Sequence, residues 1–104
     1  MGRSPDELQK IWLSALKHER RASPNTLRAY GDDVARFLAF QREHLGGNVT
    51  EHALSKLRPA DIRAFIATRR GEGLGAGGVQ RALAAIRSFY RFLAREGILE
   101  NAAP

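Results

Sequence analysis

The 104-residue chain has no cysteine and no long apolar run. The first absence excludes disulfide scaffolds and metal sites built on cysteine. The second excludes a membrane-spanning helix, which needs about 20 consecutive, mainly apolar residues. Residues 1–10 are polar and carry two carboxylates, so they lack the apolar segment of a secretory signal. We therefore expect one domain in the cytoplasm, with no membrane partner.

Patterns typical of catalytic and metal sites are also missing. The three histidines are scattered, without two of them one helical turn apart. Asp32 and Asp33 are adjacent, so in a helix they point about 100° apart, and we assign them to a helix surface rather than to acid–base catalysis. The glycines between residues 71 and 78 lack the Gly-Lys-Ser/Thr ending of a phosphate loop and indicate a flexible connector. No catalytic residue, no metal ion and no cofactor is predicted for this chain.

Charge is the most informative part of the composition. The chain has 17 basic and 11 acidic residues, a formal net charge of +6, and 14 of the basic residues are arginine. The planar guanidinium group suits bidentate contacts to phosphate and guanine. This balance indicates an acidic partner.

Four main helices are expected from start signals and apolar periodicity. Ser-Pro pairs at 4–5 and 23–24 mark two helix starts, and the second helix should reach about residue 44. Pro59 begins a third helix that ends near Gly71, and the fourth runs from about 76 to 96, where Gly97 stops it. Residues 50–55 could form a short additional helix. The predicted fold class is all-α, a four-helix bundle.

The apolar residues of these helices predict which faces point inward. In the first helix they recur at helical spacing at Leu8, Ile11, Trp12, Ala15 and Leu16. Tyr30 and Tyr90 lie on apolar faces and are predicted to be core residues. Gly31, inside the second helix, indicates either close packing or a local bend.

Two stretches of the chain are basic and free of acid. No acidic residue occurs between Gly73 and Arg95, and the polar residues there fall on a broad arc opposite the apolar stripe, at Gln80, Arg81, Arg87, Ser88, Arg91 and Arg95. A solvated face usually mixes both signs, so this arc favours a polyanion. The second stretch, residues 20–31, surrounds a helix N-terminus, where backbone N–H groups add affinity for phosphate. Its candidate contact residues are Thr26 and Arg28.

These stretches resemble a known family. Residues 23–30 and 34–40 are similar to the opening of the N-terminal core-binding domain of tyrosine recombinases and phage integrases. Residues 79–93 resemble the final long helix of that domain, and residues 73–76 are most similar to its XerC branch. The resemblance implies a SAM-like helical domain that forms half of a clamp around duplex DNA. It also implies that the second and fourth main helices approach the major groove with Thr26, Arg28, Gln80, Arg81 and Arg87, to which the charge argument adds Arg91 and Arg95.

The resemblance further implies that this chain is not a complete enzyme. In the family, a tyrosine nucleophile forms a phosphotyrosyl bond to DNA, and the catalytic residues belong to a C-terminal domain absent here. Residues 1–99 would be the DNA-binding domain, and residues 100–104 the start of a linker to the catalytic domain. The implied process is chromosome dimer resolution at a dif-like site, together with a XerD-like partner recombinase.

Two other functions remain open from the residues alone. The first is a stand-alone helical regulator of helix-turn-helix type, which needs a turn of 3–4 residues between two helices. The expected loops are longer than that turn. The second is a helical protein-interaction domain whose basic surface binds an acidic protein.

Overall fold

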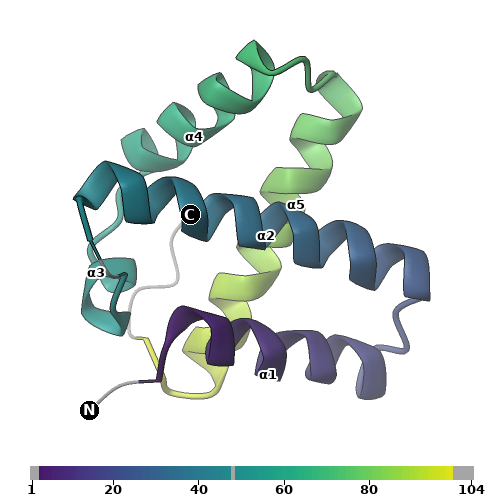
Figure 1. Ribbon diagram of the computed structural model, residues 1–104. Coiled ribbons are helices and arrows are strands. Elements are labelled where there is room, and N and C mark those ends of the chain that lie inside the picture. The colour runs from purple at the N-terminus through teal and green to yellow at the C-terminus, as the bar shows by residue number, and fades with distance from the viewer. Residues whose placement is uncertain (1–2, 48, 100–104) are drawn as a thin grey trace.

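The computed structural model describes residues 3–47 and 49–99, and this part of the chain contains helices and no strand (Figure 1). The helices are α1 (Pro5–His18), α2 (Pro24–Leu45), α3 (Glu51–Ser55), α4 (Pro59–Gly71) and α5 (Ala76–Arg95). The prediction of an all-α fold with four main helices is confirmed, and the short additional helix forms as α3. The linker predicted at residues 100–104 lies outside the described residues.

The serines of the two Ser-Pro pairs cap the helices whose starts they were predicted to mark. The Ser4 hydroxyl accepts a hydrogen bond from the Glu7 backbone N–H at 3.2 Å, and the Glu7 carboxylate accepts one from the Ser4 backbone N–H at 3.5 Å. This reciprocal pair is a capping box. At α2, the Ser23 hydroxyl accepts from the backbone N–H of Thr26 at 3.1 Å. Such caps satisfy N–H groups that have no partner within the helix, and each is worth about 1 kcal/mol.

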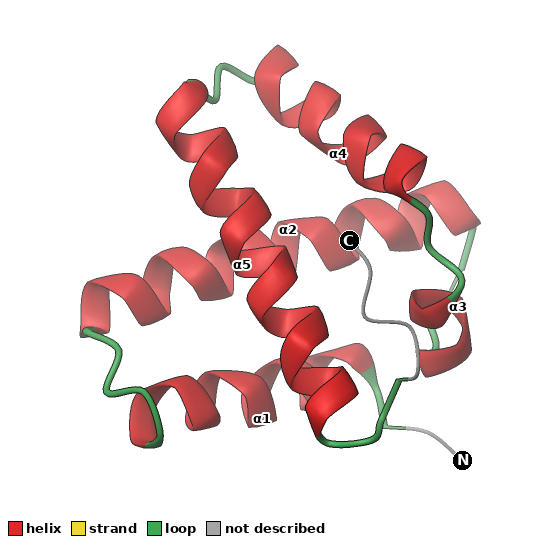
Figure 2. Cartoon of the chain, turned by 180° about the vertical axis from the view of Figure 1, so that it is seen from behind, coloured by secondary structure: helices red, strands yellow, loops and turns green. Residues whose placement is uncertain are grey.

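The helices form two pairs that cross. α1 and α2 run antiparallel, side by side, and α5 lies across them, packing mainly on α2 and also on α1 (Figures 1 and 2). α4 joins α5 at one end and diverges from it, so that the two helices form a V (Figure 2). One long face of α5 is therefore left without a covering helix.

Aromatic side chains fill the core where the helix pairs meet. The Trp12 and Phe89 rings meet edge to face with centroids 5.3 Å apart, and Phe37 meets Phe65 in the same way at 5.5 Å. Tyr90 is fully buried, and its hydroxyl donates a hydrogen bond to the Leu54 backbone carbonyl at 2.9 Å. Aromatic pairs of this geometry contribute about 0.5–1.5 kcal/mol beyond the area they bury. The core thus joins α1, α2, α4 and α5 and ties α3 to them.

One predicted inward residue faces solvent. Ile11 is 38% exposed, although Leu8, Trp12 and Leu16 of the same helix are buried. The prediction for Ile11 is wrong because Ile11 lies at the edge of the apolar face of α1, outside the part that the neighbouring helices cover. One turn of apolar periodicity does not show how wide the covered face is.

Gly31 is a point of close packing between α1 and α2. A Cβ atom at this position would lie 3.3 Å from Leu13 Cδ1, and the Gln9 side-chain amide donates a hydrogen bond to the Gly31 carbonyl at 2.7 Å. Of the two explanations for this glycine, the contacts support close approach of α1.

The ends of α5 are fixed differently. At its C-terminus, Gly97 adopts a left-handed conformation with φ 72°, and the Ile98 N–H donates to the Leu93 carbonyl at 2.9 Å. Together with a bond from the Gly97 N–H to the Ala94 carbonyl at 3.1 Å, this is a Schellman motif, and it confirms that Gly97 ends the helix. At its N-terminus, the side chain of Leu74 packs directly over Gly78.

The connection between α4 and α5 contains only the four residues 72–75. The expectation that the loops exceed a helix-turn-helix connection is therefore wrong for this pair. Leu74 and Gly73 allow the short turn: Gly73 adopts φ 101°, which favours glycine, and Leu74 folds back onto the first turn of α5.

Candidate nucleic-acid interface

The uncovered face of α5 carries three of the predicted contact residues side by side. Gln80, Arg87 and Arg91 are all exposed, and at about 100° per residue they lie within roughly 40° of one another on the helix. Within the described residues, neither arginine forms an ion pair. These two guanidinium groups are free to bind an external anion.

Arg81, predicted to face DNA, is bound to a carboxylate of α2. Its Nε and a terminal nitrogen donate to the two oxygens of Asp33 at 2.8 and 3.1 Å. The Asp33 side chain is fully buried, whereas the Arg81 side chain is 43% exposed. The hydrogen bond to Asp33, together with its negative charge, raises the pKa of Arg81. Arg81 therefore holds α5 against α2 with two of its five donors.

The burial of Asp33 corrects its assignment to a helix surface. Asp32 does lie on the surface, where it pairs with Arg36 at 2.9 Å and both side chains are more than half exposed. Asp33 points about 100° away from it, into the α2–α5 contact. A buried carboxylate is tolerated only when it is paired and hydrogen-bonded, and Arg81 supplies both.

Two other residues of the predicted arc are also engaged within the protein. The Ser88 hydroxyl accepts a hydrogen bond from Trp12 Nε1 at 3.1 Å, so it faces α1. Arg95 pairs with Glu19 at 3.1 Å and with Glu96 at 3.3 Å. Its charge is already balanced, which makes Arg95 a weaker candidate for phosphate than Arg87 or Arg91.

The two candidates at the start of α2 point in different directions. Thr26 is seven residues before Asp33, so it lies on the same side of α2, toward α5. Arg28 is five residues before Asp33 and points roughly 140° away from it. Its guanidinium donates to the Asn25 side chain at 3.1 Å. The structure therefore places Thr26, and not Arg28, on the side of α2 that meets α5.

A cavity connects the loop after α1 with α5. It measures about 260 Å³, and its charged lining residues are Glu19, Arg20, Arg91 and Arg95. Arg20 is exposed and has no ion pair within the described residues. The acid-free stretch 20–31 includes Arg20, but only the fold shows that Arg20 and Arg91 line the same cavity.

The sequence patterns missed two exposed arginines on α4. Arg63 and Arg70 are seven residues apart, which places them on one side of the helix. The seven-residue spacing indicates a shared face of the helix. Because α4 also contains Asp61, however, it was not one of the stretches without acidic residues.

The tyrosines occupy the predicted core positions. Burial raises the pKa of the Tyr90 hydroxyl, which keeps this group protonated and unreactive. Tyr30 is half-buried and stacks on Trp12 at a centroid distance of 6.3 Å. In the part of the chain described, no group of three or more histidine, aspartate or glutamate side chains is placed to hold a metal ion.

The chain is similar to known proteins over most of its length. Residues 10–97 match the family model for the N-terminal SAM-like domain of phage integrase. The chain is 48% identical over 87 residues to tyrosine recombinase XerC of Nitrobacter winogradskyi, covering 84% of this chain. It is 49% identical over 95 residues to tyrosine recombinase XerC of Mesorhizobium japonicum, covering 91% of this chain. No solved structure matches.

The match covers most of this chain but a small part of each relative. The aligned segment is 27% of the Nitrobacter protein and 30% of the Mesorhizobium protein.

Among the described residues, no helix is long and apolar enough to cross a membrane.

Proposed function

Because the chain belongs to the family of phage integrase N-terminal SAM-like domains, we propose that it binds duplex DNA as the N-terminal domain of a XerC-like site-specific tyrosine recombinase. In this proposal it forms half of a clamp that holds DNA for strand exchange. The process is chromosome dimer resolution in the cytoplasm, at a dif-like site and with a XerD-like partner. Cleavage and rejoining of DNA belong to a catalytic domain outside this chain.

The uncovered face of α5 is the observation that carries the proposal. Gln80, Arg87 and Arg91 project from a helix whose other side is fixed in the core. A single helix, about 10–12 Å across, fits a B-DNA major groove about 12 Å wide. The amide of Gln80 suits adenine, and the guanidinium groups suit guanine or phosphate.

Phosphate contacts would extend from α5 to the start of α2. Arg20, in the loop between α1 and α2, lines the same cavity as Arg91 of α5. Thr26 adds a hydroxyl on the side of α2 that meets α5, and phosphates are commonly bound by such groups near helix N-termini. Arg81 supports this surface by fixing the crossing of α2 and α5.

Fluorescence anisotropy with a labelled duplex tests the proposal. Arg91→Ala should weaken binding at least about fivefold, or about 1 kcal/mol, because a charge contact is lost. The matched control is Arg42→Ala, which removes an exposed arginine at the other end of α2 that also lacks an ion pair within the described residues. Equal affinities of the two variants, or no binding by the unaltered chain, would exclude α5 as the DNA-binding surface.

The four-residue connection between α4 and α5 also fits a stand-alone helix-turn-helix regulator. Regulators of that type bind as symmetric dimers to two half-sites about one helical turn of DNA apart. Analytical ultracentrifugation of the chain on a duplex with a single site separates the functions. One protein per site supports the recombinase domain, and an obligatory dimer supports the regulator.

A further inference from the structure

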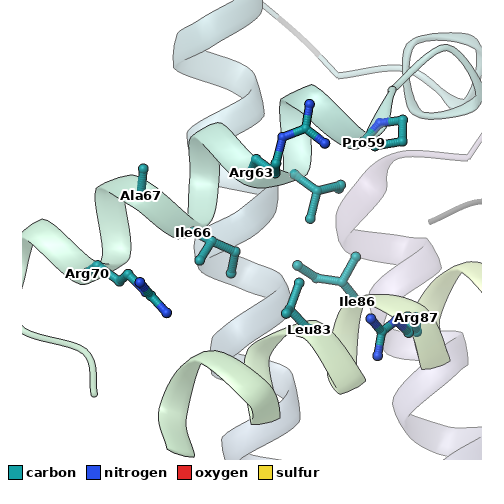
Figure 3. A pocket seen from close by; sticks show the side chains of 9 residues that line it. Pro59, Arg63, Ile66, Ala67, Arg70, Leu83, Ile86 and Arg87 are labelled. Carbon is teal, nitrogen blue, oxygen red and sulfur yellow. The ribbon is translucent and has the colours of Figure 1, made fainter. Parts of the chain in front are cut away.

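A groove opens between α4 and α5, where the two helices diverge (Figure 3). Its volume is about 380 Å³, and it is lined by Pro59, Ile62, Arg63, Ile66, Ala67, Arg70, Leu83, Ile86 and Arg87. It lies on the side of α5 away from α1. Its apolar residues continue outward from the core, and its exposed arginines on α4, Arg63 and Arg70, are not part of the DNA-binding face.

The floor of the groove is apolar and only partly covered. Ile62 and Ile86 are buried, but Ile66 and Leu83 remain partly exposed where they face each other across the groove (Figure 3). They form one contiguous surface instead of scattered exposed residues. A concave, mainly apolar surface with a few polar groups around it is typical of a binding site.

The rim of the groove carries positive charge only. Arg63 and Arg70 project from α4 and Arg87 projects from α5 (Figure 3), and all three are exposed. None of them forms an ion pair with a described residue, and no acidic residue lines the groove. Asp61, the acidic residue of α4, accepts a hydrogen bond from the Arg58 backbone N–H at 2.8 Å.

We propose that this groove binds an acidic amphipathic helix of a partner protein. The apolar side of the partner helix would cover Ile66 and Leu83, and its carboxylates would pair with the three arginines. Arg63 and Arg70 are two turns apart, or about 10.5 Å along α4, which matches carboxylates spaced by two turns on a helix lying alongside it. Helix-in-groove recognition uses apolar anchors at this same spacing.

Charge and apolarity together favour a protein over DNA in this groove. A DNA backbone would satisfy the arginines but would leave the apolar floor uncovered. Arg87 stands at the border of the groove and the DNA-binding face, whereas Arg63 and Arg70 belong to the groove alone. The proposal does not depend on DNA binding, so the two can fail separately.

The test uses this chain and a synthetic helical peptide with leucines at positions i, i+3 and i+7 and glutamates on both flanks. A second peptide has lysine in place of every glutamate. Anisotropy of the labelled peptides gives the affinities, and methyl NMR spectra report on Ile66 and Leu83. We expect the glutamate peptide to bind, the lysine peptide not to bind, and the methyl signals of both residues to shift on binding.

Paired variants separate the groove from general electrostatic attraction. Arg63→Ala/Arg70→Ala should lower the affinity for the glutamate peptide about fivefold, since two partly exposed ion pairs are worth about 1 kcal/mol together. Lys17→Ala/Arg42→Ala removes the same charge from exposed positions outside the groove and should leave peptide affinity unchanged. Duplex affinity should be the same in both double variants.

Three results would overturn the proposal. They are equal binding of the two peptides, methyl shifts outside the groove, and equal loss of peptide affinity in the two double variants. A selective loss of duplex affinity in Arg63→Ala/Arg70→Ala would instead assign α4 to the DNA-binding surface. All four altered side chains are exposed, so we expect each variant to remain folded. Circular dichroism checks this expectation.

Discussion

The two sides of α5 carry the same residue type in different roles. On the side that meets α2, Arg81 is held by the buried carboxylate of Asp33. On the uncovered side, Arg87 and Arg91 have no ion pair among the described residues. The difference depends on whether a carboxylate lies within hydrogen-bonding distance of the guanidinium group. Exposure alone does not decide it, since the Arg81 side chain is itself 43% exposed.

This difference separates residues that hold the fold from residues that are free to bind. A charge that neutralises a buried partner contributes mainly to stability, because its removal leaves that partner unpaired. An exposed, unpaired charge contributes little to stability and is available to a ligand. We therefore expect substitutions on the two sides to affect different measurements.

The largest effect is expected for Arg81→Ala. It leaves the Asp33 carboxylate buried without a partner, which should lower the free energy of unfolding by about 3 kcal/mol. This value is at the low end for buried pairs because water can reach the Arg81 side. Urea denaturation measures it, and Arg91→Ala, with an expected change below about 0.5 kcal/mol, is the control.

A double-mutant cycle distinguishes loss of the ion pair from loss of packing. Asp33→Asn/Arg81→Gln should cost clearly less than the sum of its two single substitutions, since neither charge remains. Additive costs would mean that the Asp33–Arg81 pair does not hold the two helices together.

The glycines at the start of α5 provide a second contrast between the two sides. Gly78→Ala places a Cβ atom against Leu74, with Cγ only 2.8 Å away, and should cost about 1–2 kcal/mol as Leu74 is displaced. Gly77 faces open space, so Gly77→Ala should stabilise the chain by about 0.4–1 kcal/mol. Melting temperatures that move in the same direction for both would contradict the packing of Leu74.

A smaller loss is expected for Ser88→Ala. This substitution removes the acceptor of the Trp12 indole N–H and should cost about 1 kcal/mol. The Trp12 fluorescence spectrum should change with it, because the environment of the indole becomes less polar. An unchanged stability and spectrum would show that the Trp12–Ser88 bond is not maintained in solution.

The smallest effect is expected on the duplex affinity of Arg95→Ala. Arg95→Ala should reduce duplex affinity less than Arg91→Ala does, because Glu19 and Glu96 already neutralise Arg95. Anisotropy titrations of the two variants under one salt condition provide the comparison. A greater loss for Arg95→Ala would place the DNA nearer the C-terminal end of α5.

Local signals in the sequence predicted the helices well. Ser4, Ser23 and Pro59 mark the first three long helices within a residue of their starts, and Gly97 marks the end of the last. These signals depend on hydrogen bonds between residues near one another in the chain. They can therefore be read without knowledge of the fold.

Local signals could not predict which residues of the candidate site are engaged within the protein. Asp33 and Arg81 are 48 residues apart, and nothing in either local pattern indicates that they meet. The same holds for Trp12 and Ser88, which are 76 residues apart. The basic arc on α5 was predicted correctly as a helical face, but which of its members are engaged depends on how the helices cross.

The salt dependence of duplex binding tests the division between the two sides of α5 most directly. Each phosphate contact contributes about 0.9 to the slope of log affinity against log salt concentration. Arg87→Ala and Arg91→Ala should each lower the magnitude of that slope by about 1, and the double variant by about 2, with unchanged unfolding free energies. Slopes equal to that of the unaltered chain would contradict the assignment of DNA binding to the uncovered face of α5.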